Sequence, residues 1–273
     1  MRVGGGVKEF CLSAWKAGVR GRSIQVIAAI GLFLMGVAYL SASFSPRQPQ
    51  TVALDVGFSF LRIILVLLGL FWVQELIARE VERRTVIFSV NYPVSRSAYL
   101  LGRCAGIALL LAVAALCLAV LLWGVTFLAG RHYAQQYPVD LGGPFWATVF
   151  GLWIDAMVVS CFGVLLSTLS TVSVLPLAVG ICFAIAAKTV GFARSYILSG
   201  ADGDDRLVAR MAPLLDIVRW MLPDLGRVDW RGWAMYRLFP GVETMFWGGL
   251  AAIAYGVIVL ALACWAFRYR ELG

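Results

Sequence analysis

Long runs of hydrophobic residues, separated by shorter polar segments, dominate the chain. Six of these runs have about 20 residues or more, which is the length that a helix needs to cross a hydrocarbon core of roughly 30 Å. The predicted spans are residues 23–43, 56–78, 98–130, 145–169, 174–197 and 245–267. The pattern therefore predicts an all-α polytopic membrane protein with six transmembrane helices.

The segment before the first span, residues 1–22, has a different pattern. Val7, Phe10, Cys11, Ala14 and Trp15 repeat at helical spacing, and charged residues occupy the other faces. A helix with an apolar stripe and a basic polar face is typical of the membrane surface. We therefore expect an N-terminal interfacial helix, and the absence of a small-residue cleavage site argues against a signal peptide.

The polar segment 198–244, before the last span, also has a helical pattern. Its apolar positions are Leu207, Val208, Met211, Leu214, Leu215 and Val218, and Pro213 should interrupt or restart the helix. Two interpretations remain open for this helical loop. It packs on the bundle as a surface helix, or, as part of an outer loop, it lies on the outer leaflet or caps a cavity.

Composition excludes several classes of protein. Hydrophobic residues make up 61% of the 273 residues and charged residues only 14%, whereas soluble domains contain about 25% charged residues. A soluble enzyme is therefore excluded. The net charge of +8 comes from short basic clusters beside the apolar runs, which favours an orientation signal over a nucleic-acid-binding face.

The distribution of Lys and Arg predicts the topology. The N-terminal segment carries five, the loop after the second span four and the C-terminal tail two, whereas the first loop and the loop after the third span carry one each. Because basic residues are enriched in cytoplasmic loops, both termini are expected to be cytoplasmic. Segment 198–244 holds six Arg, but long loops cross largely regardless of charge.

Residues that would support catalysis are scarce. The only histidine, His132, lies in a predicted outer loop, and no GxxxxGK[ST] phosphate loop occurs. The six cysteines show neither a disulfide framework nor metal-ligand spacing. We expect a chain that is not an enzyme and has no cofactor or metal of its own.

A few charged residues lie inside the predicted spans. Asp155 is about ten residues into the fourth span, hence roughly 15 Å deep, and Lys188, Arg62 and Arg194 fall in outer halves of spans. Buried membrane charges face protein or water. Asp155 and Lys188 are expected either to form a structural ion pair or, with the two arginines, to line a pathway for a polar or anionic group.

The densest cluster of charges, Arg79–Arg84, follows the second span and leads through Asn91, Tyr92 and Pro93 to the third. A charged helical turn, a short amphipathic piece and a proline corner would hold a short helix across the cytoplasmic surface, where a partner could push on it. The alternative is a plain connector stabilised by its charges.

This stretch resembles the cytoplasmic loop of the ABC type-2 permease family, the membrane subunits of ATP-binding-cassette exporters. The family pattern is E-x-E-[RG]-[RG]-T, then P-[VI]-S-R and Y-L-L-G-[KR]. It is matched by Glu80, Glu82, Thr85, Pro93, Ser95, Arg96, Gly102 and Arg103. Arg84 stands where many members have Gly, and Arg103 where many have Lys. The segment Leu222–Leu225 is similar to a less specific family feature.

The resemblance implies that residues 79–97 form a coupling loop that docks on a separate ATPase subunit. Contacts there would come from Glu80, Glu82, Arg83, Arg84, Thr85 and Arg96, with Tyr92 and Pro93 fixing the corner. It also implies a single permease domain (1–273) in the bacterial cytoplasmic membrane, a second permease copy or homologous permease, and two ATPase subunits that bind ATP and Mg. Membrane lipids are further expected partners, and nucleic acid is not.

Two functions therefore follow as expectations. The chain is a permease subunit that moves a substrate, in the outward direction by analogy with the family. The alternative is a membrane anchor or scaffold that docks cytoplasmic partners through the 79–97 loop without transport. The sequence does not identify the substrate, and an ATPase that co-purifies with the chain would separate the two functions.

Overall fold

The computed structural model describes residues 3–45, 47–82, 95–130, 139–170, 172–198 and 222–269. In these residues the chain consists of helices and their connections, without a strand. The helices are α1 Val3–Arg20, α2 Arg22–Ser43, α3 Pro49–Val73, a π-helical turn Gln74–Ala78, α4 Arg79–Glu82, α6 Arg96–Ala129, α7 Gly143–Leu169, α8 Leu175–Leu198, the 3₁₀ turn η2 Leu225–Val228, α10 Arg231–Tyr236 and α11 Val242–Tyr269. The prediction of an all-α fold is confirmed for this part.

Each predicted span coincides with a helix. Four helical stretches are long and apolar enough to cross a membrane: Pro49–Glu82, Arg96–Ala129, Gly143–Leu169 and Val242–Tyr269. The apolar parts of α2 and α8, Ala28–Ser43 and Leu175–Gly191, are shorter. The chain is thus compatible with a multi-pass membrane protein that has four candidate spans.

The helix ends follow local sequence signals. Pro49 and Pro144 each lie in the first turn of a helix, where the missing N–H costs nothing. The Ser95 hydroxyl caps α6 by accepting from the backbone N–H of Ala98 at 3.3 Å. The 34 residues of α6 extend over about 51 Å, which is more than a hydrocarbon core, so α6 projects beyond it.

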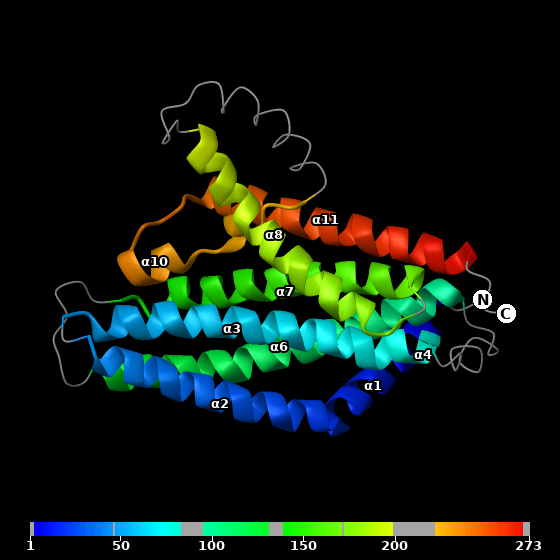
Figure 1. Cartoon of the computed structure of the whole chain (residues 1–273), viewed down its shortest axis with the longest axis horizontal. Helices are drawn as coiled ribbons and strands as arrows, with labels where there is room; N and C mark the ends of the chain where they lie inside the picture. Colours follow the sequence, from blue (N-terminus) through cyan, green and yellow to red (C-terminus); the bar gives the residue numbers. More distant parts are fainter. Residues whose placement is uncertain are drawn as a thin grey trace.

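The long helices lie side by side, and both ends of the chain are at one end of the bundle together with α4 (Figure 1). We call this the proximal end and the opposite one, which holds α10, the distal end. Helix α3 is central because it packs on α2, α6, α7 and α8. In the apolar windows of α3 and α7, 61% and 67% of residues are buried, but only 28% in α11; α11 is therefore peripheral.

The N-terminal segment is a helix, as predicted, and it packs on the proximal part of α6. A Cβ atom at Gly102 would lie 2.6 Å from Cβ of Phe10 and 2.8 Å from the Val7 carbonyl oxygen. The glycine thus allows the two backbones to approach closely. The rings of Phe10 and Tyr99 also meet edge to face at 5.2 Å. The interfacial position of α1 remains a prediction.

The segment before the last helix is described from residue 222 onward. Residues 222–241 hold only η2 and α10, and α11 begins at Val242. The amphipathic helix predicted around Leu207–Val218 lies outside the described residues.

Candidate functional site

The predicted coupling region is described at its two edges. Glu80 and Glu82 lie on α4, and Arg96 begins α6, whereas Arg83, Arg84, Thr85, Tyr92 and Pro93 lie outside the described residues. Glu82 is exposed. This edge of the proximal end can therefore present at least one carboxylate to a partner.

Glu80 and Arg96 make contacts within the bundle. The Glu80 carboxylate accepts hydrogen bonds from the Tyr99 hydroxyl and the Arg103 guanidinium, both at 2.5 Å. The Arg96 guanidinium donates to the Arg268 carbonyl oxygen of α11 at 3.2 Å. These contacts tie α4, α6 and α11 together, so both residues have a structural role that the loop pattern alone did not indicate.

The charges inside the bundle form pairs that differ from the predicted one. Asp155 of α7 is 2% exposed, and its Oδ2 accepts from Nε of Arg62 on α3. Arg62 also donates to the Ala184 carbonyl oxygen of α8 at 3.4 Å. The expected Asp155–Lys188 pair is therefore wrong: α3 packs on both α7 and α8, and its Arg62 pairs with the Asp155 carboxylate instead.

Lys188 instead binds a residue from the segment before α11. Its ammonium group donates to Oδ2 of Asp229, and Nε of Arg231 donates to Oδ1 of the same carboxylate at 2.9 Å. The Nη1 atom of Arg231 reaches α3, where it donates to Asp55 Oδ1 at 3.2 Å and to Ser59 Oγ at 2.9 Å. A chain of alternating charges thus connects α3, α8 and the segment around Asp229.

These two groups of ion pairs form one network. Asp155 interacts electrostatically with Lys188 and Asp229 as well as with Arg62. We call the set Asp55, Arg62, Asp155, Lys188, Asp229 and Arg231 the charge network. Its three acidic and three basic side chains balance in charge, and each pairs directly with at least one member of opposite sign. Arg194 lies on α8.

The segment that supplies Asp229 and Arg231 enters the distal end of the bundle between helices. We call residues 224–231 the distal wedge. The Val228 carbonyl oxygen lies 2.1 Å from the position that a Cβ at Gly151 of α7 would take, and the Asp224 carboxylate lies 2.4 Å from that of Gly191 on α8. Both glycines therefore leave room for the wedge, which packs closely against α7 and α8 at these positions.

Internal hydrogen bonds give the wedge a defined shape. The Asp224 carboxylate accepts from the Gly226 N–H at 3.1 Å and from Nε of Arg227 at 3.3 Å. The Trp230 indole N–H donates to the Arg227 carbonyl oxygen at 2.9 Å. The wedge is therefore a compact plug that the charge network attaches to α3 and α8.

Sequence reasoning identified Asp155, Lys188 and Arg62 but missed Asp55, Asp229 and Arg231. The last two stand in a polar segment where charged residues are ordinary, and Asp55 precedes the predicted start of its span. Only the sequence Asp229-Trp230-Arg231, with opposite charges on either side of a tryptophan, could have suggested a folded turn. No periodic pattern indicated that it enters the bundle.

Asp229 gives a pH-dependent prediction. Burial acts to raise the pKa of Asp229, but Lys188 and Arg231 outweigh it and hold the pKa below its ordinary value of 3.8. A carboxyl whose pKa is lower in the folded state stabilises the protein above its unfolded pKa and loses this effect as the pH falls through the folded pKa. The melting-temperature difference between wild type and Asp229→Asn should be constant from about pH 7 to 5 and shrink below pH 3.8. A difference that is independent of pH would contradict it.

Comparison of the sequence with protein-family models and with curated proteins found no match. The site is therefore interpreted from its geometry and chemistry. Ionisable residues within a membrane typically mark transport paths or conformational contacts. Here the ion pairs connect a short segment, the wedge, to the central helix α3.

Proposed function

We propose that this chain is the permease subunit of an ABC transporter in the bacterial cytoplasmic membrane. It would move a substrate outward, driven by ATP that separate ATPase subunits bind with Mg and hydrolyse. In this proposal six helices span the membrane, α1 lies at the cytoplasmic interface and both termini are cytoplasmic. Two permease subunits would form the path and contact two ATPase subunits.

The observation that carries the proposal is mechanical. Helix α3 continues through the π-helical turn into α4, so one helical rod of about 38 Å joins Asp55 at the distal end to Glu80 at the proximal end. The hydrogen bonds that Glu80 accepts from Tyr99 and Arg103 attach this rod to the first turns of α6. A push on residues 83–94 would therefore act on both helices that flank them.

The charge network connects the distal part of this rod to α7 and to the wedge. Asp55 and Arg62 on α3 hold the wedge through Arg231 and hold α7 through Asp155. Displacement of α3 would thus strain the hydrogen bonds between α3 and Arg231 of the wedge. Coupling between two ends of a bundle requires such a continuous set of rigid elements and ion pairs.

The test reverses two charges at the proximal end. Glu82→Lys with Arg83→Glu should reduce recovery of a nucleotide-hydrolysing subunit with the affinity-tagged chain, or leave that subunit bound but abolish ATP-driven transport, because the docking charges are inverted. The matched control is Arg47→Glu with Glu243→Lys, which also keeps the net charge and changes two exposed distal residues. Mass spectrometry identifies the subunit, and its ATPase rate is measured.

Three outcomes would contradict the proposal. The double variant could behave like its control, no ATPase could accompany the wild-type chain, or a cysteine placed in residues 83–94 could react only from outside the cell. A cytoplasmic partner without nucleotide hydrolysis, lost in the double variant, would indicate the scaffold function instead.

A further inference from the structure

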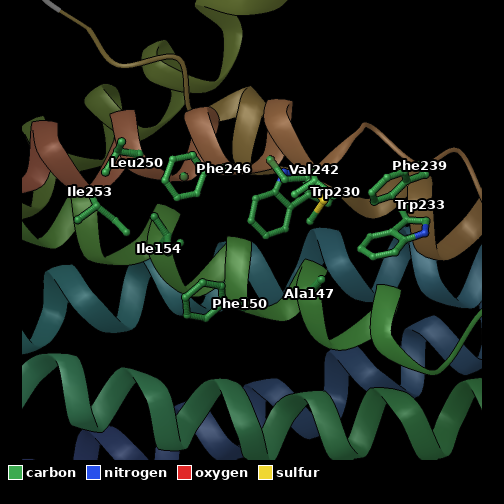
Figure 2. A pocket seen from close by; sticks show the side chains of 12 residues that line it. Ala147, Phe150, Ile154, Trp230, Trp233, Phe239, Val242, Phe246, Leu250 and Ile253 are labelled. Atoms are coloured by element: carbon green, nitrogen blue, oxygen red, sulfur yellow. The ribbon is translucent and has the colours of Figure 1, made fainter.

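An apolar cavity of about 710 Å³ lies between α7 and α11 at the distal end. Figure 2 shows Phe150 and Ile154 of α7 on one side and Phe246 and Ile253 of α11 on the other. Volumes of about 300–1,000 Å³ are typical of small-molecule sites. The volume therefore suits one ligand of moderate size.

The cavity is unsuited to water. None of its twelve lining residues carries a charged, hydroxyl or amide side chain. The indole N–H of Trp230, one of its polar atoms, already donates to the Arg227 carbonyl oxygen. The cavity is open on one side, since Phe150 is 52% and Phe246 61% exposed, and its apolar lining is expected to take hydrocarbon.

The shape of the cavity follows the helix axes. Its lining extends along α11 from Val242 to Ile253, twelve residues whose ends lie about 17 Å apart along the helix axis. Trp233 and Phe239, whose rings pack at 4.9 Å, line it near α10. With α7 and α11 in a bilayer, the cavity is a slot roughly parallel to an acyl chain, and its tryptophans stand at the level of the headgroups.

A basic residue, Arg237, lies in the chain between Trp233 and Phe239, which line the aromatic end of the slot. Arg237 follows α10 with φ of 57°, the left-handed conformation that glycine usually adopts at this position, and its N–H donates to the Trp233 carbonyl oxygen. The residue is exposed, and its guanidinium forms no hydrogen bond or ion pair with the other residues that the structure describes. Glu243 lies in the first turn of α11, where the helix dipole stabilises its negative charge.

From the slot and its cation together, we infer that the cavity binds one acyl chain of an anionic phospholipid, with Arg237 at the phosphate group. A guanidinium forms bidentate hydrogen bonds with phosphate. A second copy of the chain fits less well, since a two-fold contact centred here would oppose two concave surfaces and fill neither. This inference requires no ATPase partner, so it can fail or hold independently of the proposed function.

Filling the cavity provides the main test. A Cβ at Gly249, which lines the cavity, would meet no atom within 4 Å, so Gly249→Leu should fill the slot without a clash. Gly124→Leu on α6 is the matched control, because its Cβ also meets open space and the residue is outside the cavity. Each variant is reconstituted in nanodiscs of equimolar phosphatidylglycerol and phosphatidylcholine and transferred to mild detergent, and native mass spectrometry counts the retained lipids.

The wild type and Gly124→Leu should each retain one more phosphatidylglycerol than Gly249→Leu. Arg237→Gln should retain a lipid but lose the preference for phosphatidylglycerol, whereas Arg47→Gln should keep it. Equal retention by the wild type and Gly249→Leu would overturn the inference, as would a disulfide between two copies of Leu250→Cys in membranes.

A measurement on the unmodified chain avoids any folding defect of the variants. Phosphatidylglycerol with a diazirine in its acyl chain is photolysed in the same nanodiscs, and adducts are located by mass spectrometry. They should concentrate on residues 147–154 and 242–253. An even distribution over the lipid-facing helices would count against a site.

Discussion

Replacement of Arg62 by Met is expected to lower the free energy of unfolding by about 3–5 kcal/mol, because it leaves a buried charge without its partner. The charge is the Asp155 carboxylate, which is 2% exposed. Its other oxygen, Oδ1, has no hydrogen-bond partner among the described residues. A loss of this size is a large part of the total stability of a typical domain, about 5–15 kcal/mol.

The double variant Arg62→Met with Asp155→Leu is the control. Replacing both members of a buried pair by apolar residues removes the unpaired charge and is often close to neutral, so it should recover most of the loss. Stability is measured in bicelles by SDS-induced unfolding, followed by circular dichroism. If the single and double variants were equally unstable, the arginine would act through packing and not through its charge.

Asp155→Asn distinguishes the two interpretations of these membrane charges. If the pair only supports the fold, the change should reduce the amount of folded protein. If the network lines a path, folded protein should remain and the range of transported substrates should change. The same reconstituted samples provide both measurements.

The helices were predictable because the thickness of a membrane determines their length. Span 98–130 corresponds to α6, Arg96–Ala129, and span 145–169 to α7, Gly143–Leu169. Hydropathy reports how long a segment stays in hydrocarbon, and this property is local. The position of the wedge was not predictable in this way, because residues 224–231 are polar in sequence and yet pack between the helices.

The partners of the charges were not predictable, since they depend on which helices are neighbours. Asp155 and Lys188 lie on consecutive helices, but α3 brings Arg62 to Asp155 and the wedge brings Asp229 to Lys188. Glu80 illustrates the same point at the proximal end. Its motif predicted a contact with another subunit, whereas Tyr99 and Arg103 of the same chain bind it.

The second large effect is expected from the smallest possible change, Gly151→Ala. The added methyl group would lie 2.1 Å from the Val228 carbonyl oxygen, and this backbone atom cannot move without shifting the wedge. Overpacking of this kind costs about 1–3 kcal/mol. Displacement of the wedge would also strain the contacts of Asp229 with Lys188 and of Arg231 with Asp55.

Gly163→Ala on the same helix is the matched control. Its methyl group would lie 3.0 Å from Cδ2 of Leu70, the flexible end of a side chain, so the neighbour can give way. Both changes add one methyl group to α7, and both positions are buried. A difference between the two variants therefore reports the wedge and not the helix.

Thiol labelling of Val228→Cys, in a chain whose native cysteines are replaced, follows the wedge directly. Val228 is 1% exposed, so labelling requires the wedge to leave its seat, and its rate follows the population of the open form. A destabilisation of about 1–3 kcal/mol corresponds to labelling about 5–150-fold faster in Gly151→Ala, with Gly163→Ala close to the wild type. Equal labelling rates in the two alanine variants would mean that the wedge does not rest on α7 at Gly151. The proposed coupling from α3 through the wedge to α7 would then lack this contact.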